Sequence, residues 1–128
     1  MFSESLLLTG SFADQSCQNR LTAEFQQFAM EANRRGPVAM DGGIRWDRTV
    51  AGPGTRMTYH YTLTSLSSKE INRQTLTRQM KPALIAIACA DKRFKPSFQC
   101  GATYIYTYKG NDGVEIARIG INRDDCGY

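Results

Sequence analysis

The sequence is poor in the residues on which catalysis most often depends. Its single histidine, His60, is the one imidazole that could activate a nucleophile, and no G-x-S-x-G elbow is present. The loop AGPGTR at residues 51–56 lacks the lysine of a P-loop, and a strand pattern follows it, so we interpret it as a turn. These absences predict a protein that is not an enzyme and uses no cofactor.

Metal-binding patterns are missing as well. The cysteines show no C-x-x-C spacing, and the acidic residues at Asp112 and Asp124–Asp125 do not have the spacing of a calcium loop. No metal site is therefore predicted. The alternative hypothesis is a toxin effector or hydrolase that uses His60 or scattered acidic residues, with Glu24, Glu70 and Glu115 as candidates.

Positive charge is present but not concentrated. Sixteen Lys and Arg against twelve Asp and Glu give a net charge of +4, and the basic residues are spread along the chain. A protein that binds nucleic acid electrostatically usually presents a basic stripe. Nucleic acid is therefore not the expected partner, and a weak basic nucleic-acid binder is the second alternative.

Long apolar runs are also absent. A membrane-spanning helix needs about 20 apolar residues, and no segment approaches this length, so no membrane span is expected. Near the start of the chain, the apolar run Leu6–Leu8 is shorter than the core of a signal peptide, and no basic residue precedes it. These residues do not predict a signal peptide.

Cysteine is present in an even number. All four residues, Cys17, Cys89, Cys100 and Cys126, can be paired, and disulfides persist in oxidising compartments. We therefore predict two disulfides and a periplasmic or secreted location. Four cysteines allow three pairings, and the spacing leaves all three open.

Length and periodicity predict one domain. The 128 residues suffice for a single core, with residues 1–13 as a flexible N-terminal segment and residues 14–128 as the domain. A helix is expected from about residue 14 to residue 35, where Gly36 and Pro37 end it. Its apolar stripe consists of Leu21, Phe25, Phe28, Ala29 and Ala32.

Two strands are expected next. A short strand carries Ile44, Trp46 and Val50 between turns rich in glycine. Residues 57–63 then alternate between large apolar and small polar side chains, which is typical of a half-buried strand.

A second helix is predicted after these strands. Ser67 and Glu70 have the spacing of a capping box, so we expect the helix to begin there and to continue to about Cys89. Pro82 should kink this helix or divide it in two.

The last third of the sequence predicts a β-hairpin. Two alternating runs flank the turn KGNDG at residues 109–113, whose glycine, asparagine and aspartate suit a tight turn. On the return strand, alternation places Val114, Ile116 and Arg118 on the face opposite Ala117, Ile119 and Ile121. The whole pattern predicts an α+β fold, with an antiparallel sheet of three to four strands, two helices packed on one face, and disulfide staples.

Tyrosine forms the most regular side-chain pattern. Tyr104, Tyr106 and Tyr108 share one face of a strand, and Tyr59 and Tyr61 share one face of another. These rows either pack beneath the helices, which we favour because one face of a small sheet must be covered, or form an exposed contact surface. The candidate protein-binding residues are these five tyrosines with Arg45, Trp46, Arg48, Arg56, Lys92, Arg93 and Lys95.

The C-terminal half resembles a known family. The shared features are a helix ending in Cys89, Gly101 before a Y-x-Y-x-Y strand, an N-D-G turn, a final D-D-C, and the upstream segments P-V-A-M-D-G-G and Y-H-Y-T-L. They are similar to the putative quorum-sensing-regulated virulence factor family of small exported bacterial proteins, over residues 37–126. The resemblance implies an exported α+β domain without enzymatic activity. It also implies a Cys89–Cys126 bridge, which leaves Cys17 to pair with Cys100.

These features together predict a small exported bacterial protein that acts by binding another protein. We expect the protein to be an immunity protein or inhibitor that neutralises a toxin or hydrolase, or else a virulence-associated factor. A stapled scaffold that carries aromatic and basic side chains and no catalytic set favours this function over the two alternatives.

Overall fold

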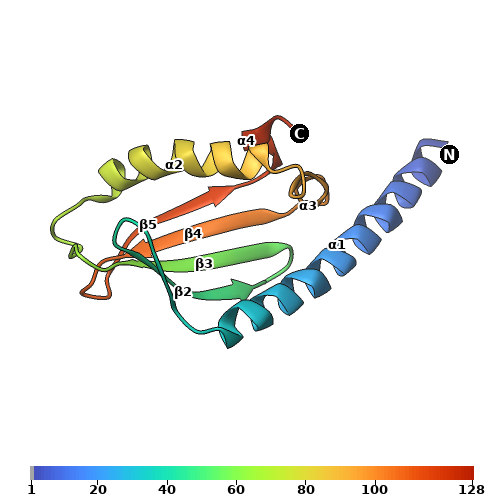
Figure 1. Ribbon diagram of the computed structural model, residues 1–128. Helices are drawn as coiled ribbons and strands as arrows, with labels where there is room; N and C mark the ends of the chain where they lie inside the picture. The colour runs from blue at the N-terminus through green and yellow to red at the C-terminus, as the bar shows by residue number, and fades with distance from the viewer. Residues whose placement is uncertain (1) are drawn as a thin grey trace.

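The fold is a sheet of five strands with its helices on one face (Figure 1). The computed structural model describes the backbone of residues 2–128 and the side chains from residue 15 onward. In chain order the elements are α1 (Phe2–Arg34), β1 (Val38–Met40), β2 (Ile44–Ala51), β3 (Arg56–Leu63), α2 (Arg73–Ala90), α3 (Lys95–Gln99), β4 (Thr103–Lys109), β5 (Glu115–Ile121) and α4 (Arg123–Cys126). Within residues 2–128, no helix combines the length and the hydropathy of a membrane span. The predicted flexible segment, residues 1–13, lies outside the described side chains and stays a prediction.

The strand count and strand directions correct the predicted antiparallel sheet of three to four strands. The strand order is β1-β2-β3-β4-β5, and β3 runs parallel to β4, whereas the other neighbours are antiparallel. The three-residue β1 is too short to show an alternating pattern. The segment between β3 and β4 contains α2, and a crossover helix between adjacent strands makes them parallel. The α+β class and the placement of both long helices on one face agree with the prediction.

The second helix begins later than the prediction. The backbone N–H of Ser67 does donate to Glu70 Oε1 over 2.9 Å, but these residues form a turn. The cap of α2 is Asn72, whose side chain accepts the backbone N–H of Thr75 over 2.8 Å. Pro82 lies inside α2 and does not divide it.

Alternation along the strands gives the sheet two unlike faces. The face under the helices carries the core, which includes Met57 and Tyr104, 1% and 4% exposed. On β5 the alternation is broken by a bulge opposite Tyr108 and Lys109. Ile116 is therefore buried in the core beside Ala117, and not on the opposite face as predicted.

Two disulfides hold helices to the rest of the fold. Cys17 of α1 is bonded to Cys100, which follows α3, and Cys89 of α2 is bonded to Cys126 of α4. These are the pairs that the family resemblance implies. Because disulfides persist in oxidising compartments, they agree with the predicted periplasmic or secreted location.

The C-terminal end of α1 is attached to the sheet by one side chain. The amide of Asn33 donates to the backbone carbonyl of Thr49 over 2.8 Å and accepts from the N–H of Thr49, also over 2.8 Å. β1 pairs with residues 44–46 of β2 and stops short of Thr49. Asn33 thus supplies the two hydrogen bonds that a longer β1 would have made.

Substitution of Asn33 should loosen this attachment. We expect Asn33→Ala to lower the free energy of unfolding by about 1–3 kcal/mol, because Thr49, itself 1% exposed, loses both partners. Urea unfolding followed by the fluorescence of Trp46 would measure the change. Asn33→Asp keeps the acceptor and loses the donor, so its free energy of unfolding should lie between those of the unmodified protein and Asn33→Ala. Equal stabilities for all three proteins would contradict the role of Asn33.

Candidate functional site: an aromatic groove between the helices

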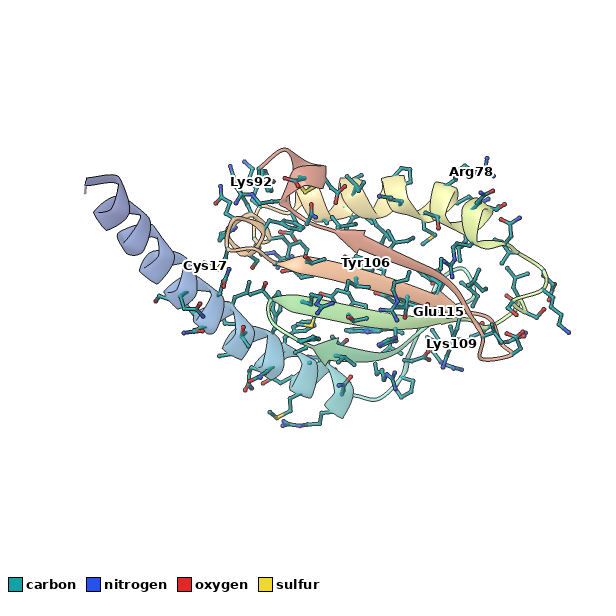
Figure 2. All side chains as sticks on the ribbon, turned by 180° about the vertical axis from the view of Figure 1, so that it is seen from behind. Cys17, Arg78, Lys92, Tyr106, Lys109 and Glu115 are labelled. Carbon is teal, nitrogen blue, oxygen red and sulfur yellow. A yellow bond between two sulfur atoms is a disulfide. The ribbon has the colours of Figure 1, made fainter. Side chains whose placement is uncertain are left out.

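Stacked tyrosine rings occupy the middle of the helix-covered face. α1 packs mainly on β2 and α2 on β5, so β3 and β4 lie between the two long helices (Figure 1). The rings of Tyr59 and Tyr106 stack with centroids 5.2 Å apart, and Tyr61 lies 6.4 Å from Tyr106 and 5.2 Å from Tyr108. Figure 2 shows Tyr106 at the centre of the sheet. The two tyrosine rows thus form one continuous aromatic layer.

One end of this layer is the floor of a groove, which we name the aromatic groove. Its volume is about 370 Å³, and it lies between α1 and the segment around α3. Phe28 stands on its α1 side, 46% exposed, with its ring edge-on to Tyr59 at 6.5 Å. The lining residues are Glu24, Phe25, Phe28, Met57, Tyr59, Arg93, Phe94, Ser97 and Tyr104.

The floor is chemically suited to binding and not to proton transfer. The tyrosines of the floor are Tyr59 and Tyr104, whose rings stack with centroids 6.3 Å apart. Burial is the main cause that raises the pKa of both phenols above its ordinary value. Both phenols are therefore neutral at physiological pH, and they offer flat apolar area with uncharged hydrogen-bonding groups. Surfaces that contact proteins are enriched in such groups.

The structure separates the predicted contact residues into two sets. The five tyrosines face the helices, and Trp46 joins them, with its ring 6.3 Å from that of Tyr59. Arg45 pairs with Thr62 and Arg48 with His60 across β2 and β3, so both arginines lie on the opposite, open face. Arg56 pairs with Thr103 on that same face. The side-chain period of two thus separates the tyrosines from these arginines, and one surface does not contain both.

The basic residues after α2 lie near the aromatic groove. Arg93 lines the groove and forms an ion pair with Asp91 at 2.7 Å. Lys95 places its Nζ atom 5.1 Å from the ring centroid of Tyr128, and Lys92 is exposed at the same end of the molecule (Figure 2). Of these three residues, Arg93 is the one that lines the aromatic groove.

Sequence reasoning missed part of the groove. Phe28 was expected within the buried stripe of the first helix, yet it is 46% exposed, while its stripe neighbours Leu21 and Phe25 are buried. Periodicity assigns a residue to one face of a helix, but it does not show which residues of that face are left uncovered by the rest of the fold. Phe94 lies beside Tyr104, at a ring distance of 5.2 Å, and forms another wall of the groove.

The candidate acidic residues are not brought together. Glu24 lines the aromatic groove, Glu115 is paired with Arg118 at 3.0 Å, and Glu70 accepts from a backbone N–H. Among residues 15–128, no three His, Cys, Asp or Glu side chains are grouped as a metal site would require. The three candidate glutamates thus take part in three different sets of contacts.

The fold and the groove define a class: a small disulfide-bonded α+β domain with an aromatic groove. A protein from Pseudomonas aeruginosa, described as a putative secreted protein, has this fold with a TM-score of 0.70, at 14% identity over 86% of this chain and 96% of its own. The type II secretion system pilotin AspS from Vibrio cholerae has it with a TM-score of 0.65, at 16% identity over 88% and 97%. The pilotin EpsS of the Vibrio vulnificus type II secretion system has it with a TM-score of 0.69, at 12% identity over 88% and 96%.

These similarities extend over nearly the whole of each chain and concern the fold. No family model and no curated protein matches the sequence. The resemblance to the quorum-sensing-regulated family accordingly stays a prediction, whereas the fold is one that a secreted protein and two pilotins share.

Proposed function

We propose that the protein is an exported domain without catalytic activity, and that it binds a segment of another protein in the aromatic groove. The observation that carries this proposal is the exposed phenylalanine Phe28, which stands over a floor of stacked tyrosines. An exposed aromatic cleft with neutral polar groups is what a protein segment with apolar side chains can fill.

The fold supports a more specific form of this proposal. Two structures with the same fold are pilotins of type II secretion systems, so we propose a pilotin-like role in which the bound segment belongs to a component of a secretion system. This step is an analogy of fold, which by itself does not determine function. The immunity-protein, inhibitor and virulence roles stay predictions, and the groove is compatible with a toxin or hydrolase segment as well.

A charge placed in the groove should abolish this binding. We expect Phe28→Glu to weaken the complex at least about tenfold, because the substitution removes an aromatic contact and buries a carboxylate against tyrosine rings. The binding partners to test are the purified exported components of the type II secretion system of the same organism. The signal is the fluorescence of Trp46, the single tryptophan, which lies 6.3 Å from Tyr59.

The same helix provides a matched control. Met30 is 55% exposed on α1 and does not line the groove, so Met30→Glu should leave affinity unchanged. Equal losses for Phe28→Glu and Met30→Glu would exclude the aromatic groove as the binding surface. A component that binds both variants and the unmodified protein equally would contradict the proposal in the same way.

A further inference from the structure

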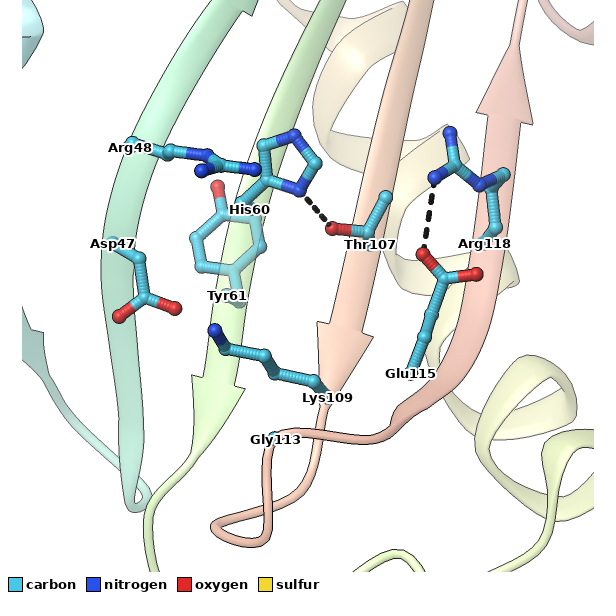
Figure 3. Close-up of a pocket in the computed structure, with 9 residues that line it drawn as sticks. All are labelled: Asp47, Arg48, His60, Tyr61, Thr107, Lys109, Gly113, Glu115 and Arg118. Carbon is cyan, nitrogen blue, oxygen red and sulfur yellow. Dashed lines mark hydrogen bonds and ion pairs between the residues drawn. The ribbon is translucent and has the colours of Figure 1, made fainter.

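The open face of the sheet carries a second concavity, which has no role in the proposed function. It has a volume of about 310 Å³, and it is lined from β2, β3, β4 and β5 (Figure 3). In Figure 3 the helices lie behind the sheet, so this concavity and the aromatic groove are on opposite faces. We name it the basic concavity after its charges, which come from Asp47, Arg48, Lys109, Glu115 and Arg118.

Strand register builds the basic concavity from two rows of side chains. The first row consists of side chains that are successive partners across the four strands, in the order Arg48, His60, Thr107 and Arg118. An arginine therefore stands at each end of this row, and the row contains no acidic residue. The next row contains Thr62, Lys109 and Glu115. Thr107 is 3% exposed although no described helix covers this face, because the longer side chains around it leave it at the bottom of the hollow.

The carboxylates of the basic concavity are already paired. Asp47 accepts from Arg45 over 2.6 Å and from the hydroxyl of Thr62 over 2.5 Å, and Glu115 accepts from Arg118 over 3.0 Å. Within the described residues, Arg48 and Lys109 form no ion pair within 4.0 Å. These two cations therefore have no ion-pair partner at contact distance, and the charge of Lys109 acts on Asp47 from farther away by lowering its pKa.

His60 lies next to Arg48, its partner across β2 and β3. Its Nδ1 atom is 2.7 Å from the hydroxyl of Thr107, so in the neutral ring this hydroxyl can donate to Nδ1 and leave the Nε2–H as a donor for a ligand. Burial, then Arg48 and Arg118, lower the pKa of His60, while Glu115 raises it and Lys109 lowers it. The surroundings of the ring are thus electropositive, and an anion would relieve this repulsion.

We propose that the basic concavity binds a phosphate monoester group through Arg48, Lys109 and His60. Such a group carries about two negative charges at neutral pH, which matches the two unpaired cations. Its oxygens accept hydrogen bonds from a guanidinium fork, an ammonium and an imidazole N–H. A neutral sugar or a carboxylate would leave at least one of the two cations without a counter-charge.

The single histidine makes this proposal directly testable. The probe is glycerol 3-phosphate, and the readout is the ring proton signals of His60 in one-dimensional NMR spectra at constant ionic strength. We expect a saturable shift with a dissociation constant on the order of 1 mM or lower, and a raised pKa of His60 in the complex. Glycerol alone should give no shift.

Charge-matched variants separate a site from general attraction. Arg48→Gln with Lys109→Gln should weaken binding of glycerol 3-phosphate at least about tenfold. Arg78→Gln with Lys81→Gln removes the same charge from exposed positions of α2 and should leave binding unchanged. Equal effects of the two pairs, or no saturable shift with the unmodified protein, would overturn the proposal.

A second arm identifies the source of the phosphate. Cosedimentation with vesicles containing phosphatidic acid, which has a monoester headgroup, is compared with vesicles of phosphatidylglycerol, which has a diester. Binding to glycerol 3-phosphate without binding to either vesicle indicates a soluble ligand. Selective binding to phosphatidic acid, lost in the Arg48 and Lys109 variant, indicates a lipid headgroup. Vesicle binding that the double variant retains would count against the basic concavity. None of these results depends on the aromatic groove, which lies on the other face.

Discussion

A variant with Cys17→Ser and Cys100→Ser is expected to lose about 4 to 5 kcal/mol of unfolding free energy. The bridge joins residues 83 positions apart, and in the chain-entropy model a loop of that length corresponds to roughly this value. Natural domains are stable by about 5 to 15 kcal/mol, so the variant should be close to the limit of folding. Urea unfolding of the oxidised protein and of the variant, followed by Trp46 fluorescence, gives the difference.

The same substitutions should also affect the aromatic groove. The Cys17–Cys100 bridge holds α1 covalently, so without it α1 is held by the packing of Leu21, Phe25 and Ala29 and by Asn33 at its C-terminal end. We expect faster amide hydrogen exchange in α1 after residue 15, and weaker binding of a groove partner.

The second disulfide provides the comparison. Cys89 and Cys126 are 37 positions apart, so Cys89→Ser with Cys126→Ser should lower stability by a similar amount, about 4 kcal/mol. This bridge joins α2 to α4 and does not hold α1. Under conditions where both variants are folded, this one should retain binding. If both lose binding to the same extent, the Cys17–Cys100 bridge has no particular role in forming the groove.

Phe98→Ala is expected to lower the free energy of unfolding by about 3 to 5 kcal/mol. The Phe98 side chain is 0% exposed, and its ring lies 5.3 Å from that of Tyr104 and 6.2 Å from that of Tyr128. Truncation would leave a cavity where α3 meets the sheet, and large-to-small changes in cores typically have this effect. Guanidinium unfolding would measure it.

An exposed phenylalanine serves as the reference for Phe98. Phe28→Ala removes the same atoms from a side chain that is 46% exposed, so we expect a loss of about 1 kcal/mol or less. Comparable losses at the two positions would show that α3 is not anchored through Phe98. A small effect at Phe28 would also establish that changes there act on binding and not on folding.

Alternation was the most informative pattern for the fold. The strands β3, β4 and β5, the final hairpin and the helix-covered tyrosine face follow from a period of two in the side chains, whereas β2 was indicated by the glycine-rich turns around it. The direction of β3 relative to β4 does not follow from it, since periodicity is the same in parallel and antiparallel strands. The helix between them was the available indication, because a strand, a helix and a strand in succession form a parallel crossover.

The candidate sites were harder to predict because each depends on distances between elements. The tyrosines were correctly expected beneath the helices, but the groove beside the exposed Phe28 depends on how far α1 lies from the segment around α3. In the same way, the sequence placed His60 among threonines without showing that Arg48 and Arg118 flank its row. Local patterns determine the face of each side chain, whereas a cleft depends on which strands are neighbours.

The parallel pairing of β3 with β4 also bears on when the aromatic layer can form. β2 and β3 are joined by a short turn, as are β4 and β5, and each pair can associate early because little chain must be closed. The partners on β3 and β4 are 47 positions apart, for example Tyr59 and Tyr106, and contacts so distant in sequence form slowly. The tyrosine layer spans this junction, so neither half of the molecule contains it alone. The aromatic groove, which is lined from both β3 and β4, therefore forms only when the two halves of the chain have assembled.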